Sequence, residues 1–203
     1  MRIFGIDPGS VRTGYGCVES DGRRHRLIVC GAITPPAGDA FPQRLARIHH
    51  QLAALIASCR PDCVAVENLF HGINPRSALK LGHARGVAIL AAVDAGCAIV
   101  EYTPAEVKRA VVGYGRADKR QVQGMVKLLL GLDALPSPHD AADALAIAIC
   151  HLHSTPPAGL KARRYEGGRV VKADVQAGRL VEADLQVRPA KARSWRQYRP
   201  PVG

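Results

Sequence analysis

Apolar residues in the first 33 positions fall into three short runs, which are separated by residues typical of tight turns. These runs predict three strands, at Arg2–Asp7, Gly14–Glu19 and Leu27–Ile33. The turn sequence Asp7-Pro8-Gly9-Ser10 ends the first strand, and Asp21-Gly22 lies between the second and the third. Because connections this short join antiparallel neighbours, the chain is expected to open with an antiparallel sheet.

The next part of the chain alternates between segments whose apolar residues have helical spacing and short, continuous apolar runs. Apolar residues recur at helical spacing after Pro42 and predict a first helix there. They are Leu45, Ile48, Leu52, Leu55 and Ile56. A second helix is predicted from Arg76 to about Ala95. The apolar runs Cys63–Glu67 and Ala98–Tyr102 predict buried strands before and after that second helix.

Three further helices are predicted, two of them from clear start signals. Thr103-Pro104-Ala105-Glu106 combines an N-cap threonine, a proline at the first helical position and a glutamate at the third. Asp118–Leu130 is the next helix, and Ser137-Pro138-His139-Asp140 repeats the start signal for a helix that ends near residue 152. This order predicts an α/β fold with one mixed five-stranded sheet flanked by helices.

The regular pattern stops near residue 153 and divides the chain into a domain at 1–153 and an extension at 154–203. The linker-like sequence Pro156-Pro157-Ala158-Gly159 follows this boundary. Two similar segments, 168–176 and 178–186, are then expected either to pair as a hairpin or to stay loose. The extension has too little apolar surface to form a domain of its own.

Charge is distributed unevenly between the two parts. Residues 1–150 hold 17 basic and 13 acidic residues, and residues 151–203 hold 11 and 4, so the net charges are +4 and +7. An excess of this size favours a polyanionic partner such as nucleic acid through counterion release. We expect the extension to add affinity for such a partner that does not depend on its sequence.

The apolar runs and the cysteines indicate in which cellular compartment the protein is expected. No uncharged apolar run is long enough to cross a membrane, and the apolar run at the N-terminus stops at Asp7, which is too early for a signal peptide. The six cysteines are scattered without zinc-binding spacing, so they are expected to be reduced core thiols. A cytoplasmic protein without a membrane partner is predicted.

Four acidic residues occupy positions at which a charge is unusual. Asp7 and Glu67 end predicted strands, and Asp140 and Asp143 lie three residues apart at a helix start, so that they share one face. Carboxylates suit Mg²⁺, which takes hard oxygen ligands. Two carboxylates about 4 Å apart repel by roughly 4 kcal/mol at an effective dielectric near 20, so a cluster of four requires cations.

Two of these acids have a simpler interpretation when each is taken alone. Asp7 before Pro-Gly is ordinary turn chemistry, and Asp140 in a first helical turn complements the helix dipole. Asp143 and Glu67 are harder to explain in this way, because an unpaired charge in so apolar a run costs several kcal/mol. The four acids together favour a metal site.

Five segments resemble the RuvC family, the bacterial Holliday-junction resolvases (crossover junction endodeoxyribonucleases). They follow the family's order and spacing over about residues 1–153, and they are Gly5-Ile6-Asp7-Pro8-Gly9-Ser10, Val66-Glu67-Asn68-Leu69-Phe70, Ser77–Gly86, Val111-Val112-Gly113-Tyr114-Gly115 and Asp140–Ala148. The resemblance implies a ribonuclease H-like fold and a homodimer. It also implies that the protein resolves four-way junctions by paired, symmetric nicks that leave 5′-phosphate ends, in homologous recombination and DNA repair.

The resemblance also implies a metal site and a partner. Asp7, Glu67, Asp140 and Asp143 match the family's acidic residues and are expected to hold two Mg²⁺ ions per subunit, for which Mn²⁺ can substitute. Asp7 is expected to bridge the two ions. Because part of the family has histidine in place of Asp140, and His139 is adjacent here, a role for Asp140 in proton transfer stays open. The RuvA–RuvB branch-migration complex is the implied partner.

Six further residues are expected to contact DNA. Lys108 and Lys119 match family lysines near the DNA, with solvated helix surface as the alternative. Phe70 is expected to stack on an unpaired base, with a core contact as the alternative. The weaker candidates for phosphate binding are Arg76, Lys80 and Arg85. The nearby stripe of Ala78, Gly82 and Gly86 is expected either at the dimer interface or against the sheet.

Three other classes of protein fit parts of the sequence. Sugar-kinase and actin-like ATPases share the sequence Asp7-x-Gly9 after a first strand, but they need a second, related half and a longer chain. A nuclease-fold protein that acts on structured RNA is the nearest alternative, and Phe70 with Ser77–Gly86 favours the junction enzyme over it. An inactive DNA-binding module would keep the basic surface without the four acids.

Overall fold

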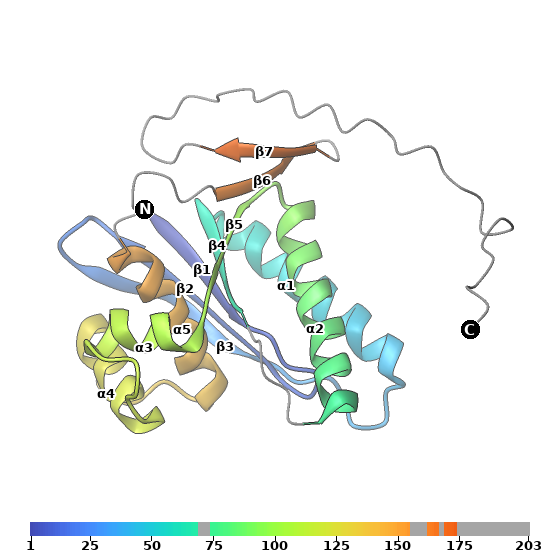
Figure 1. Cartoon of the computed structure of the whole chain (residues 1–203), viewed down its shortest axis with the longest axis horizontal. Coiled ribbons are helices and arrows are strands. Elements are labelled where there is room, and N and C mark those ends of the chain that lie inside the picture. The colour runs from blue at the N-terminus through green and yellow to red at the C-terminus, as the bar shows by residue number, and fades with distance from the viewer. Residues whose placement is uncertain (69–73, 155–161, 167–168, 174–203) are drawn as a thin grey trace, which may run out of the picture.

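The computed structural model has a mixed sheet with helices on both faces (Figure 1). It describes residues 1–68, 74–154, 162–166 and 169–173. The strands are β1 (Arg2–Asp7), β2 (Thr13–Ser20), β3 (His25–Ile33), β4 (Cys63–Glu67), β5 (Ala98–Tyr102), β6 (Ala162–Glu166) and β7 (Arg169–Ala173). The helices are α1 (Phe41–Cys59), α2 (Pro75–Asp94), α3 (Pro104–Val112), α4 (Lys119–Leu130) and α5 (His139–His153).

The strand order is β3-β2-β1-β4-β5-β6-β7. β1, β2 and β3 pair antiparallel, whereas β4 is parallel to both β1 and β5, so the first five strands form the expected mixed sheet. β6 extends the sheet beyond β5 through the pair Ile99 and Arg163, and β7 pairs antiparallel with β6. The segment 178–186 lies outside the described residues, so its expected pairing with segment 168–176 stays a prediction.

The start of α5 differs from its prediction. Ser137 was expected to cap this helix, but the N-cap residue is Pro138, and no side chain caps the helix. The backbone N–H of Ala141 donates to the carbonyl of Pro138 at 2.9 Å, which begins the helix at His139 and makes Asp140 its second residue. The predicted capping box of Thr103 and Glu106 at α3 is confirmed.

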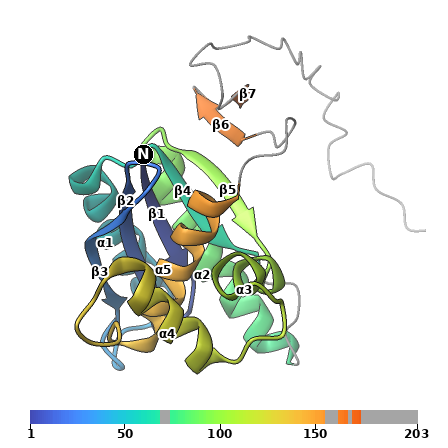
Figure 2. The ribbon, with the colours of Figure 1, turned by 90° about the vertical axis from the view of Figure 1, so that its left-hand side faces the viewer.

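Strand alternation separates two hydrophobic cores. Helices α1 and α2 cover one face of the sheet, and α3, α4 and α5 cover the other, onto which Figure 2 looks. The buried apolar residues of β1 and β4 on the α1–α2 face are Phe4, Ile6, Val64 and Val66. Those on the α5 face are Ile3, Cys63 and Ala65. Because successive side chains point to opposite faces, Asp7 and Glu67 belong to the α5 face.

Helix α5 packs unusually close to β1 and β2. A Cβ atom on Gly5 would lie 2.0 Å from the carbonyl oxygen of Ala144, and one on Gly14 would lie 2.0 Å from that of Asp140. No side chain fits at these distances, so both strand positions require glycine. The contact places the first turns of α5, which carry Asp140 and Asp143, over the end of β1 at Asp7 and the start of β2.

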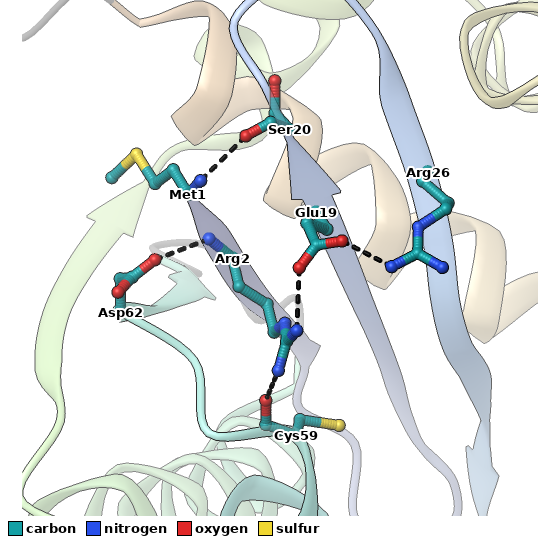
Figure 3. Close-up of polar contacts among 7 residues, drawn as sticks. All are labelled: Met1, Arg2, Glu19, Ser20, Arg26, Cys59 and Asp62. Carbon is teal, nitrogen blue, oxygen red and sulfur yellow. Dashed lines mark hydrogen bonds and ion pairs between the residues drawn. The ribbon is translucent and has the colours of Figure 1, made fainter.

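A polar network holds the opposite end of the sheet together (Figure 3). The Arg2 guanidinium donates to the carbonyl of Cys59 at 2.6 Å and to Glu19 at 2.7 Å, and Arg26 also donates to Glu19. These contacts join β1 and β3 to β2 and to the end of α1. The two guanidinium groups, Arg26 first, lower the pKa of Glu19 to about 2.

Four of the six cysteines lie in the core as expected, whereas Cys30 and Cys97 are only half-buried. Cys17, Cys59, Cys63 and Cys150 are buried, and burial raises the pKa of the Cys63 thiol to about 12, as expected for an unreactive core thiol. Within the described part of the chain, every helix is too short or too polar to cross a membrane.

Gly5→Ala is expected to lower the free energy of unfolding by about 1–3 kcal/mol, because the methyl group overpacks the contact with Ala144. Gly124→Ala is the matched control, since a Cβ at this α4 position meets nothing within 4 Å. It should be neutral or stabilising by up to about 1 kcal/mol. Urea denaturation measures both, and equal effects of the two substitutions would contradict the close packing of α5.

Candidate active site

Parallel pairing of β1 with β4 brings two of the acids together. Ile6 lies opposite Val66 in this ladder, so Asp7 and Glu67 follow at the carboxyl ends of adjacent strands. Both residues point to the α5 face by alternation. Asp7 and Glu67 are the last residues of their strands, so their carboxylates lie side by side at this edge of the sheet, beneath the start of α5.

Helix α5 completes an acidic cavity of about 240 Å³. The residues lining this cavity are Asp7, Glu67, Pro104, Val107, Lys108, Lys119, Val122, Asp143, Ala146 and Ile147. Asp140 is at its edge: its charge contributes to the raised pKa of Asp7, but its carboxylate faces Arg12, 3.3 Å away. The structure thus brings three of the predicted acids into one cavity and places the fourth beside it.

Burial and mutual repulsion dominate the electrostatics of the cavity. Burial, followed by the charges of Glu67, Asp143 and Asp140, raises the pKa of Asp7 to about 8. The pKa of Glu67 is raised as well, chiefly by burial and then by the charge of Asp143, while a hydrogen bond with Asp7 opposes the shift. Such shifts mark a site with more negative charge than the protein neutralises.

Two lysines from the neighbouring helices partly balance this charge. Lys119 Nζ lies 2.7 Å from Asp143 Oδ2, and this hydrogen bond raises the pKa of Lys119 against the opposing effect of burial. Lys108 of α3 lines the cavity, and its charge tends to lower the pKa of Glu67. Both lysines therefore lie where a phosphate group over the cavity would meet a positive charge.

The donor set fits a hard divalent cation, although its present arrangement does not chelate one. Among the described His, Cys, Asp and Glu side chains, no group of three or more is arranged to hold a metal ion. Lys119 and Arg12 instead hold the oxygens of Asp143 and Asp140. Carboxylate oxygens are ligands that Mg²⁺ prefers, and a divalent charge would relieve the repulsion that raises the pKa of Asp7.

The remaining residues predicted to bind DNA lie away from this cavity or outside the described residues. Phe70 lies outside the described residues, so its stacking role stays a prediction. Arg76 is exposed at the start of α2, and Lys80 Nζ lies 5.9 Å from the centre of the Phe41 ring. Arg85 forms an ion pair with Glu101 at 2.6 Å, which already occupies its charge.

Sequence reasoning missed two residues beside the acids. Arg12 contacts Asp140 from the loop that follows Asp7, and a basic residue so close to a candidate ligand was a usable signal. Gln123 of α4 is buried, and its amide donates to Nδ1 of His139 at 2.9 Å. Nothing in its local sequence indicated that contact.

The free energy of unfolding of the metal-free protein is expected to fall as the pH rises from about 4 to about 8. Asp7 has a pKa of about 8 in the folded protein and an ordinary value when unfolded, so the folded state binds more protons in this window. Asp7→Asn should flatten the fall and raise the melting temperature at pH 8 by about 2–4 °C for each kcal/mol gained.

Calorimetry in EDTA, compared across pH, measures this effect. The exposed residue Asp133 is the control, because Asp133→Asn should leave the pH profile of the wild type unchanged. A profile for Asp7→Asn as steep as that of the wild type would show that Asp7 is not the buried acid described above.

Known proteins that are similar to this chain identify its family. The family profile of crossover junction endodeoxyribonuclease RuvC matches residues 3–151. RuvC of Chloroflexus aggregans is 54% identical over 156 residues, which cover 77% of this chain and 95% of that one. The solved structure of Thermus thermophilus RuvC is 37% identical, with a TM-score of 0.70, covering 75% of this chain and 94% of that one.

A second Thermus thermophilus RuvC structure, in complex with a Holliday junction substrate, is 34% identical with a TM-score of 0.70, over 75% of this chain and 94% of that one. The similarity spans the five-stranded sheet and the helices that carry the acids. The match at this identity extends over nearly the whole length of these relatives. This chain belongs to the RuvC family of crossover junction endodeoxyribonucleases.

Proposed function

We propose that this protein resolves four-way DNA junctions by hydrolysing one phosphodiester bond in each of two opposed strands, leaving 5′-phosphate ends. The convergence of Asp7, Glu67 and Asp143 on one cavity, in a chain of the RuvC family, carries the proposal. Homologous recombination and DNA repair are the processes in which such an activity serves. The complex of Thermus thermophilus RuvC with a Holliday junction supports the choice of substrate.

The four acids are proposed to hold two Mg²⁺ ions, for which Mn²⁺ would substitute. When bound, such ions supply an activated water and stabilise charge on the leaving 3′ oxygen. Asp7 is the proposed shared ligand, because its pKa responds to the charges of all three other acids. Lys119 and Lys108 would bind the phosphate from the α4 and α3 side and offset its negative charge.

A homodimer is proposed, with an exposed stripe of α2 at its interface. Leu79 and Leu90 are 65% and 49% exposed, and Gly82 and Gly86 lie between them with nothing within 4 Å of an added Cβ. These four residues share one face of the helix, opposite the buried alanines, so the stripe does not pack on the sheet. A two-fold axis through such a stripe would let two helices approach closely and would match the dyad of a four-way junction.

The C-terminal extension, the cellular location and a partner complex complete the proposed function. The extension at 154–203, with its net charge of +7 over residues 151–203, is proposed to add affinity for DNA backbones. A cytoplasmic location and cooperation with a RuvA–RuvB branch-migration complex follow from family membership.

Asp7→Asn is expected to bind a synthetic four-way junction but to cleave it more slowly than the wild type. The loss should exceed the roughly 100-fold that removal of an outer-shell partner of a metal ligand can cause, because a direct ligand is lost. Gel-based cleavage with and without Mg²⁺ measures the rate, and Asp133→Asn is the control with full activity. Cleavage by Asp7→Asn at the wild-type rate, or by the wild type in EDTA, would contradict the proposal.

Leu90→Lys is expected to convert the dimer to a monomer, because it places a charge in the apolar stripe of each subunit. The variant should nick one strand of the junction without the coordinated second cut. Leu128→Lys on α4 is the matched control, since Leu128 is 73% exposed outside the stripe. Sedimentation analysis reports the oligomeric state, and a dimeric Leu90→Lys variant would place the interface elsewhere.

A further inference from the structure

One cation beside the acids comes from the sheet side of the site rather than from the helices that carry the two lysines. Arg12 lies in the loop between β1 and β2, and its Nη1 atom is 3.3 Å from Asp140 Oδ2. The residues lining the cavity include Lys108 and Lys119 but not Arg12, so Arg12 stands outside the cavity on its Asp140 side. Cations therefore approach the acids from three parts of the chain, namely the β1–β2 loop, α3 and α4.

The loop that carries Arg12 is held firmly in place. The Thr13 side chain is fully buried; its hydroxyl donates to the carbonyl of Gly9 at 2.8 Å and accepts from the Gly9 N–H at 3.3 Å. From α1, Arg44 Nη2 donates to the carbonyl of Ser10 at 3.0 Å. Contacts from β2 and α1 thus fix the backbone on both sides of Arg12, although the Arg12 side chain itself is 47% exposed.

The ion pair between Arg12 and Asp140 adds little to the stability of the fold, so stability does not explain why Arg12 is held at this place. At 3.3 Å and with both side chains partly exposed, such a pair contributes about 0–1 kcal/mol. It does hold the guanidinium at the edge of the acidic cavity. An exposed arginine on a rigid loop beside a cluster of acids is well placed to meet an anion that arrives together with metal ions, since the guanidinium fork matches phosphate geometry.

We infer that Arg12 binds a backbone phosphate of the substrate strand on the Asp140 side of the scissile phosphate, opposite Lys108 and Lys119. The inference rests on the proposed function, because it assumes a DNA strand across the acids. Asp140 orients the guanidinium in the free protein. When a divalent cation binds Asp140, the guanidinium gives up this partner and turns to the phosphate, so that the strand is held on both sides of the cavity.

The salt dependence of junction binding tests this role without cleavage. Binding of the full chain to a fluorescent four-way junction is measured across salt concentrations, at equilibrium in EDTA and by stopped flow in Mg²⁺ before cleavage occurs. Arg12→Gln should weaken binding to junctions of different sequence alike and reduce the slope of log K against log salt by about 0.9 per subunit, the value for one lost phosphate contact. The effect should be larger in Mg²⁺ than in EDTA. Arg12→Lys should keep the slope and lose only part of the affinity.

Arg23→Gln is the matched control, since Arg23 is an exposed arginine in the β2–β3 turn at the opposite end of the sheet, and its slope should equal that of the wild type. An unchanged slope for Arg12→Gln overturns the inference. Electron paramagnetic resonance measures Mn²⁺ binding by the same variant. If Arg12→Gln binds Mn²⁺ more tightly while the salt slope stays unaltered, Arg12 only neutralises Asp140, and the inference is again overturned. Failure of the wild type to bind the junction would instead contradict the proposed function.

Discussion

The close approach of α5 to β1 and β2 is the contact on which the rest of the site depends. Gly5 and Gly14 leave no side chain between the strands and the helix, so Ala144 and the backbone of Asp140 rest directly on the sheet. A bulkier interface would raise the start of α5 away from the strand ends. Two acids from the sheet and two from the helix share one location because this interface is thin.

Gathering these acids destabilises the metal-free protein. Asp7 is raised to a pKa of about 8 by burial and by the other three carboxylates, and only Lys119 and Arg12 form ion pairs with the cluster among the described residues. These two cations pair with Asp140 and Asp143, and no group of three or more described His, Cys, Asp or Glu side chains is arranged to hold a metal. Divalent cations bound at these acids would offset the excess negative charge, and their binding would free both basic side chains to face DNA.

Local patterns in the sequence predicted the elements and the acids, whereas contacts between distant residues escaped them. Glu67 and Asp143 stood out because each interrupts an apolar run. Ser137 looked like a cap, but the bond from Ala141 to Pro138 starts α5 one residue later. Arg12 follows Asp7 closely in the sequence, but its contact with Asp140 and that of Gly5 with Ala144 join residues more than 120 positions apart, which no local pattern indicates. The family resemblance supplied what spacing could not, namely the substrate and the number of metal ions expected.

The most direct test of this account is anomalous diffraction from crystals soaked in Mn²⁺. The account predicts manganese peaks at the end of β1, with Asp7 bound to an ion that also contacts Glu67 or an acid of α5. In the same crystals Asp143 and Asp140 should have turned from Lys119 and Arg12 toward the metal. Peaks bound only by acids of a single element, or no peak near Asp7, would contradict the claim that the thin interface between α5 and the sheet builds a shared metal site.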